Sequence, residues 1–122
     1  MDHKTNINEL KEKVKKFCDD RDWDQYHNAK ELAIAIVTEA SELLEHFRFK
    51  SEDQVEDMFK DEFKRKELTE EMADVLYFLV RLAQRYEVDL TTELNEKIKK
   101  NAEKYPVEKV KGLNKKYTEY EE

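Results

Sequence analysis

Glycine and proline are almost absent from this chain, whose 122 residues include one of each, Gly112 and Pro106. Tight turns between β-strands usually need glycine, proline or an Asn-Gly pair, because the backbone has to bend sharply there. A sheet protein of this length would need several such turns, whereas helices can be joined by polar loops. The sequence therefore predicts an all-α fold, and its length leaves room for one domain.

Apolar residues recur at helical spacing along most of the chain. The repeats predict helices at about residues 6–18, 31–46, 51–63, 68–86 and 89–104. The pattern breaks at Asp19–Asn28, which is expected to be a loop, and more weakly at Lys64–Glu67. We assign residues 1–106 to the domain and residues 107–122, which are too polar to carry a core, to a C-terminal tail.

Charge and composition narrow the set of partners. The net charge of −7 argues against nucleic acid and against an anionic membrane surface, since both bind proteins through positive charge. The longest apolar run, Val75–Val80, is far too short to span a bilayer. Residues Met1–Lys4 contain no hydrophobic signal region, and Cys18 has no second cysteine to pair with, so a cytoplasmic location is expected.

Two pairs of acids are candidates for chemistry. Glu39 and Glu42 lie on adjacent turns of one predicted helix, and Glu71 and Asp74 repeat the spacing on another. Spacing alone decides little, because the chain has 30 acidic residues and most such pairs belong to solvated helix faces. Position separates these two pairs from the others, because they lie within or beside the apolar stripes of their helices.

Carboxylates at such positions need a partner that neutralises their charge or a proton that removes it. Glu71 falls in the middle of the apolar stripe of its helix, and Glu39 borders the stripe of its own. Residues 32–46 include no lysine or arginine, and residues 68–82 include only Arg81, which is predicted on the polar side. Buried carboxylates must be paired, protonated or metal-bound. A hard divalent cation resolves the repulsion, and all-oxygen ligation favours magnesium or manganese.

Other known phosphate and metal motifs are missing. Without a glycine-rich loop, neither a P-loop nor a dinucleotide-binding fold is possible. Metal and side chains would then have to hold any phosphates, and Lys97, Asn101 and Lys104 share one face of their predicted helix. A di-iron bundle would need two acid-x-x-His motifs, but Asp24 and His27 form the only one. Alternatively, the two lysines are ordinary solvent-exposed charges that bind no phosphate.

The spacing of the four acids resembles the signature of a known protein family. Glu39-x-x-Glu42, a spacer of 28 residues and Glu71-x-x-Asp74 resemble the metal-binding signature of the MazG-like all-α nucleoside triphosphate pyrophosphatases. Further segments resemble the dCTP pyrophosphatase branch: Arg21–His27, Asp74–Leu76, Val88–Leu90, Asn101–Pro106 and Lys116–Thr118. The chain departs from that branch at Phe49, where tryptophan is typical.

The resemblance implies roles for particular residues. The four acids of the two pairs would bind magnesium, or alternatively manganese, and one of them would orient or deprotonate the attacking water. The triphosphate or sugar would contact Lys97, Asn101, Lys104 and Tyr105. His27 and Phe49 would enclose the base. From the residues alone, the preferred interpretation of His27 is a loop-packing histidine, and Phe49 could be a satellite core residue.

The implied fold is a MazG-like bundle of about four to five helices, completed by oligomerisation as a homodimer or homotetramer. The nearly all-round apolar surface of the 68–86 helix also predicts such an interface. The implied reaction is hydrolysis of a nucleoside triphosphate, dCTP or a related pyrimidine, between its α and β phosphates. Two alternatives stay open: the same fold acting on dUTP or phosphoribosyl-ATP, and a non-catalytic acidic helical interaction module.

Overall fold

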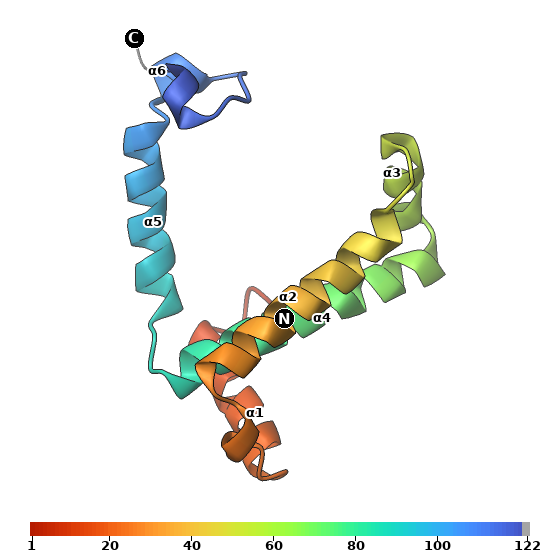
Figure 1. Cartoon of the computed structure of the whole chain (residues 1–122), viewed down its shortest axis with the longest axis vertical. Helices are drawn as coiled ribbons and strands as arrows, with labels where there is room; N and C mark the ends of the chain where they lie inside the picture. Colours follow the sequence, from red (N-terminus) through yellow and green to blue (C-terminus); the bar gives the residue numbers. More distant parts are fainter. Residues whose placement is uncertain (121–122) are drawn as a thin grey trace. The chain divides into compact units, whose positions relative to one another are not determined.

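The computed structural model describes residues 1–120, and the chain divides into two compact units, Met1–Val88 and Asp89–Glu122. The described residues form helices and no strands, so the all-α prediction is confirmed (Figure 1). None of the described helices is long and apolar enough to cross a membrane.

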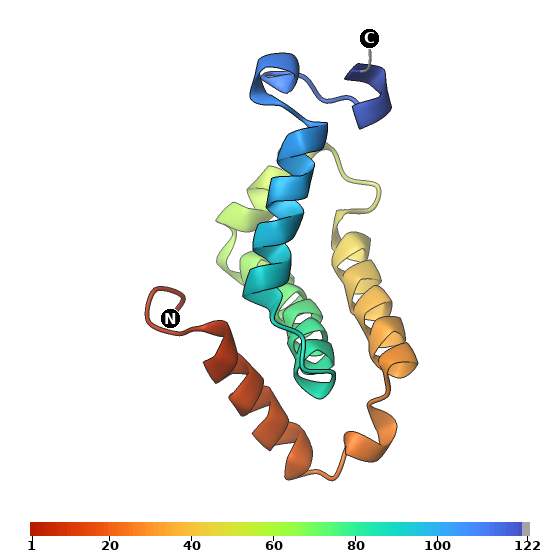
Figure 2. The ribbon, with the colours of Figure 1, turned by 90° about the vertical axis from the view of Figure 1, so that its left-hand side faces the viewer.

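The first unit is organised around one long helix. Its elements are α1 (Ile7–Asp19), the 3-10 turn η1 (Asp24–Tyr26), α2 (Ala29–Phe47), α3 (Glu52–Lys60) and α4 (Glu62–Arg85). Helix α4 packs against α1, α2 and α3, and both ribbon views show α2 beside it (Figures 1 and 2). The backbone N–H of Ala29 donates to Tyr86 Oη at 2.8 Å, and His46 lies 3.5 Å from Glu71. Helices α2 and α4 therefore run antiparallel.

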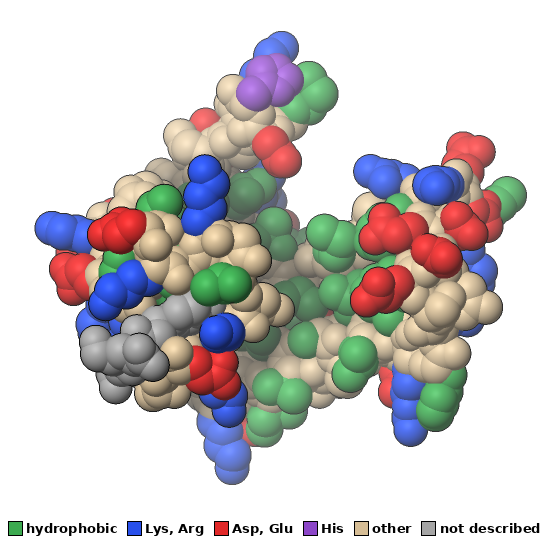
Figure 3. All heavy atoms as spheres, turned by 90° about the horizontal axis from the view of Figure 1, so that it is seen from above, with side chains coloured by type: hydrophobic (Ala, Val, Ile, Leu, Met, Phe, Trp, Pro, Cys, Tyr) green, Lys and Arg blue, Asp and Glu red, His purple; other side chains and the backbone are tan. Residues whose placement is uncertain are grey.

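The core of this unit is narrow. Leu32, Leu68, Val80 and Ala83 are buried, together with Cys18. Many large apolar side chains remain exposed, and Figure 3 shows such side chains lying open to solvent beside charged ones. On α2 and α4 they are Ile34, Val37, Leu44, Phe63, Met72, Leu76 and Leu79. One chain alone thus buries only part of its apolar surface.

Side-chain caps set most helix starts. Asn28 accepts a hydrogen bond from the backbone of Glu31, and Ser51 forms a capping box with Gln54. The predicted weak break at Lys64–Glu67 is wrong, because the chain breaks earlier, at Asp61. Asp61 takes an extended conformation and its carboxylate accepts from the backbone of the new helix, whereas lysine, arginine and glutamate continue a helix readily.

Three turns after helices are made without glycine. Asp22, Phe49 and Glu87 adopt left-handed backbone conformations with φ of 54°, 65° and 53°. Glycine is the residue usually found there, because a side chain crowds the backbone in that region. Gly112, with φ of 80°, is the described glycine in such a turn.

The second unit contains α5 (Leu90–Lys104), the short α6 (Val107–Val110) and the 3-10 turn η2 (Tyr117–Tyr120). The cap of helix α5 is Asp89, whose side chain accepts a hydrogen bond from the backbone N–H of Thr92. Its apolar residues Leu94 and Ile98 are more than half exposed. The predicted polar tail contains α6 and η2, and its last residues, 121–122, lie outside the described part of the chain.

Candidate functional site

Three of the four predicted acids meet between α2 and α4. One carboxylate oxygen from each of Glu39, Glu42 and Glu71 lies within 4.8 Å of the others. Glu39 and Glu42 are one turn apart on α2, and the antiparallel packing places Glu71 of α4 opposite them. Asp74 is exposed and outside this group, but its charge still acts on Glu39. We call Glu39, Glu42 and Glu71 the acid cluster.

The acid cluster is electrostatically unfavourable when it is alone. Burial raises the pKa of Glu39 to about 7, aided by its hydrogen bond with Glu42 and by repulsion from Glu42, Asp74 and Glu71. Oxygen Oε2 of Glu71 is buried and has no hydrogen-bond partner among the described residues. An unpaired buried carboxylate oxygen is costly. Because all the available donors are oxygens, the cluster fits a hard divalent cation.

Sequence reasoning missed one residue beside this cluster. The Nε2 atom of His46, on the last turn of α2, lies 3.5 Å from Oε1 of Glu71, and both side chains are mostly buried. The sequence argument found no lysine or arginine for the acids and overlooked the histidine. His46 follows Glu39 by seven residues, which is two helical turns, so helical spacing could have revealed it. Its imidazole can orient one oxygen of Glu71 and leave the other free.

Phe49 lies just beyond α2 and is 92% exposed. The guanidinium of Arg48 lies 4.7 Å from the centroid of its ring. The alternative that Phe49 is a satellite core residue is therefore wrong for the single chain. A large aromatic that is both exposed and held in a left-handed conformation has no evident role in the stability of this unit.

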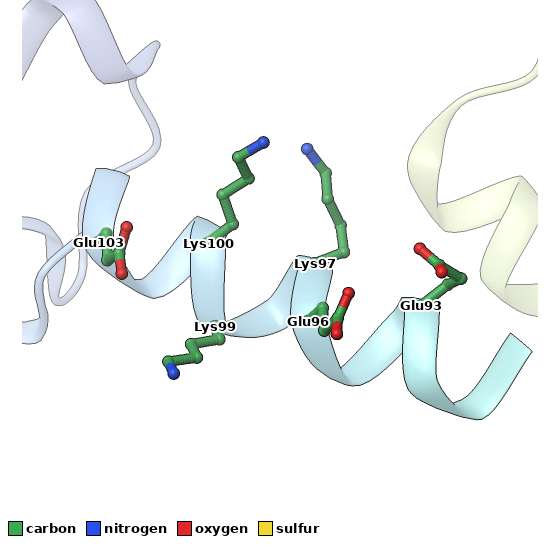
Figure 4. Close-up of a pocket in the computed structure, with 6 residues that line it drawn as sticks. All are labelled: Glu93, Glu96, Lys97, Lys99, Lys100 and Glu103. Atoms are coloured by element: carbon green, nitrogen blue, oxygen red, sulfur yellow. The ribbon is translucent and has the colours of Figure 1, made fainter.

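Four other predicted residues belong to the second unit. Lys97, Asn101 and Lys104 lie on α5, and Tyr105 follows its end. All four are exposed. Figure 4 shows Lys97 and Lys100 extending in the same direction from α5, with Lys99 on the opposite side. Lys100 was not predicted, and it adds a second positive charge beside Lys97.

Comparison with known proteins gives this arrangement a family. The sequence model of the MazG-like family matches residues 34–120, a span that includes the acid cluster and α5. The chain belongs to the MazG-like family. A solved pyrophosphatase from Archaeoglobus fulgidus superposes with a TM-score of 0.77 at 36% sequence identity, covering 82% of this chain and 92% of that one.

Curated relatives of this MazG-like chain carry a more specific name. It is 39% identical over 103 residues to dCTP pyrophosphatase 1 of Rattus norvegicus and 37% identical to that of Homo sapiens. The matches cover 84% of this chain. The chain spans 61% of the length of these relatives.

This MazG-like protein has a second charged cluster, around Arg81, whose position was predicted wrongly. Arg81 was expected on the polar side of α4, but its side chain is completely buried. Its guanidinium donates hydrogen bonds to Asp24, to Nδ1 of His27 and to Gln84. The Asp19–Asn28 loop covers this flank of α4, and the periodicity of one helix cannot reveal that. We call Arg81, Asp24 and His27 the arginine cluster.

His27 is thus packed in its loop. Arg81 Nε donates to its Nδ1 at 2.8 Å, and the ring of Trp23 lies 6.0 Å from its own ring. Burial, with the positive charge of Arg81, lowers the pKa of His27. No hydrogen bond or ion pair among the described residues joins His27 to the acid cluster. The predicted contact of His27 with a base stays a prediction.

Proposed function

We propose that this MazG-like protein is a magnesium-dependent nucleoside triphosphate pyrophosphohydrolase acting on dCTP or a related pyrimidine nucleotide. The observation that carries the proposal is the acid cluster, in which a buried oxygen of Glu71 lacks a partner. Similarity to dCTP pyrophosphatase 1 and to a solved pyrophosphatase supports the reaction and its substrate. The products would be a nucleoside monophosphate and pyrophosphate.

The acids would act together on metal and water. Glu39, Glu42 and Glu71 would hold the ion with help from Asp74, and magnesium or manganese suits their oxygens. A bound divalent cation would neutralise phosphate charge and lower the pKa of a water molecule. One of the four carboxylates would accept the proton of the attacking water. His46 would keep Glu71 oriented through its Oε1 atom.

Residues outside the acid cluster would recognise the nucleotide. The triphosphate or sugar would be held by Lys97, Asn101, Lys104 and Tyr105. Phe49 would stack on the base, which agrees with its exposure and its lack of a structural role. His27 would complete the base pocket.

The working form we propose is a homodimer or homotetramer in the cytoplasm, without nucleic acid or membrane partners. The exposed apolar residues of α2 and α4 support this assembly, because a patch left open by one chain can be covered by another. Light scattering at the protein concentration used for activity assays measures the oligomeric state of the active protein. A fully active monomer at working concentration would contradict the proposal.

A nucleotide panel tests the reaction. The purified protein is given dCTP, dUTP, the other nucleoside triphosphates and phosphoribosyl-ATP, with magnesium or with chelator, and pyrophosphate and orthophosphate are measured separately. We expect pyrophosphate release that requires the metal, with dCTP preferred. Preference for dUTP or phosphoribosyl-ATP would assign a different substrate to the same type of reaction. Orthophosphate as the first product would contradict cleavage between the α and β phosphates, and no turnover would favour a non-catalytic interaction module.

A further inference from the structure

The arginine cluster contains the one charged side chain that is fully buried among the described residues, and the proposed reaction does not use it. Burying a guanidinium is costly unless its hydrogen-bond donors are satisfied. Arg81 meets this need with acceptors from two elements: Asp24 and His27 from the loop, and Gln84 from its own helix. A charge placed this deeply constrains the atoms that accept its hydrogen bonds.

The constraint on His27 follows from the chemistry of the two side chains. Arginine stays protonated in proteins, so its Nε always carries a hydrogen and can only donate. Nδ1 of His27 receives that hydrogen bond and must therefore be the unprotonated nitrogen of the ring. The ring proton then belongs to Nε2. Within residues 1–120, Nε2 makes no hydrogen bond of its own.

Further contacts hold the backbone of the same segment. Arg85, one turn beyond Arg81, donates from Nε to the backbone oxygen of His27 at 3.4 Å. Tyr86 accepts the backbone N–H of Ala29, where α2 begins. The end of α4 thus fixes the His27 ring, its backbone and the start of the helix that carries Glu39. The family match begins at residue 34, so the loop half of this arrangement lies outside it.

We propose that Arg81 is a positioning residue that locks His27 as the neutral tautomer with its proton on Nε2. The ring then offers a nucleotide a hydrogen-bond donor and no acceptor. Its partner would be an acceptor atom of the substrate, such as a carbonyl oxygen or an unprotonated ring nitrogen of a pyrimidine. The substrate half of this inference rests on the proposed function, whereas the tautomer does not.

Burial and the charges around His27 disfavour a positive ring. Burial has the largest effect, Arg81 and Arg85 of α4 act in the same direction, and Asp24 of η1 acts against them. Together they hold the pKa of His27 below its ordinary value. Protonation would also place a hydrogen on Nδ1, against the Nε–H of Arg81.

Nitrogen NMR of the imidazoles tests the tautomer directly. In the wild-type chain at pH 7.5, above the ordinary pKa of histidine, His27 should show the Nε2–H form. Arg81→Met should produce a tautomer mixture with a pKa nearer the ordinary value of about 6.5. Arg85→Met is the matched control, because Arg85 reaches the backbone and not the ring, so Nε2–H should persist. An Nδ1–H or a charged ring in the wild type would overturn the inference.

Two substitutions of His27 separate positioning from simple packing. Asparagine places its amide near the position of Nδ1, so His27→Asn keeps an acceptor for Arg81 and loses the donor at Nε2. We expect an unchanged melting temperature and a KM raised about tenfold, the scale of one lost hydrogen bond to a buried polar group. His27→Gln reaches the position of Nε2 and should lower the melting temperature with a KM closer to wild type.

The outcomes distinguish this inference from the proposed function. A His27→Asn protein with wild-type KM would overturn the substrate role of His27 and leave it a packing residue. A wild-type protein that shows the Nε2–H tautomer but cleaves no nucleotide would overturn the proposed function and the substrate role together. The same result would still support Arg81 as the residue that fixes the tautomer.

Discussion

Two charged clusters on α4, ten residues apart, differ in how their buried charges are compensated. The acid cluster at Glu71 gathers like charges and leaves one buried oxygen without a partner. The arginine cluster at Arg81 surrounds one buried charge with acceptors. The first leaves a buried oxygen of Glu71 without a partner, whereas each nitrogen of the Arg81 guanidinium has one. This difference supports a metal at the acid cluster and a positioning role for Arg81.

The clusters should respond oppositely to pH. The pKa of Glu39 is raised, so its contribution to stability is present below its unfolded pKa and is lost as pH rises through about 7. The pKa of Asp24 is lowered, chiefly by its hydrogen bond from Arg81, so its contribution is present above its unfolded pKa and is lost as pH falls. At neutral pH the arginine cluster therefore supports the fold, whereas the metal-free acid cluster works against it.

The largest effect is expected when the acid cluster loses a charge. Glu71→Gln should reduce turnover by roughly 100-fold or more, the scale for removing a key electrostatic group. The same change should raise the melting temperature of the metal-free protein, because it removes repulsion from Glu39 and Glu42. Steady-state kinetics and calorimetry measure the two effects. Glu70→Gln, an exposed neighbour with the same charge change, should alter neither. Full activity in Glu71→Gln would refute the metal-site interpretation.

Neutralising an acid of the arginine cluster should lower the stability of the fold, in contrast to Glu71→Gln. Asp24→Asn should destabilise the protein by roughly 1–2 kcal/mol, less than for a fully buried pair because about half of the Asp24 side chain is in solvent. Chemical denaturation measures this. Asp20→Asn, which breaks an exposed pair with Lys16, should have a smaller effect. Equal stability of the two variants would mean that Arg81 does not need Asp24.

Phe49 provides a reference point outside both clusters. Phe49→Ala should raise KM about tenfold, the scale of one base–aromatic stacking contact, and leave the melting temperature nearly unchanged. Phe63→Ala removes another exposed ring and should leave KM unchanged. If Phe49→Ala instead lowers the melting temperature and keeps KM, the ring packs against protein in the working assembly.

The smallest effect should be the pH dependence of metal affinity. Because the pKa of Glu39 is about 7, a metal ion must displace its proton at lower pH. Magnesium should therefore bind about threefold more weakly at pH 6.5 than at pH 7.5, from the change in the ionised fraction. Titration calorimetry at the two pH values measures this. Glu39→Gln should abolish the difference, and equal affinities in the wild type would show that Glu39 is already ionised.

Local patterns predicted the helices and the candidate acids, because both can be recognised from spacing within single helices. That three of the acids meet depends on the packing of α2 against α4. Glu71 was recognisable as a charge within an apolar stripe and Glu39 as one beside a stripe, and His46 could have been found as well, from its helical spacing from Glu39. Arg81 could not, because its burial depends on a loop more than fifty residues earlier in the sequence. The break at Asp61 was missed because a single cap decided it against favourable helix formers on both sides.

The left-handed turns at Asp22, Phe49 and Glu87 affect the unfolded chain as well as the folded one. A glycine at any of these positions would relieve crowding in the native turn, but it would also give the denatured chain more conformations to lose on folding. A sequence with one glycine begins folding from a less diverse ensemble. The smaller loss of conformational entropy on folding offsets part of the steric cost of each left-handed turn. Position 49 can therefore carry a phenylalanine where glycine would be the usual residue.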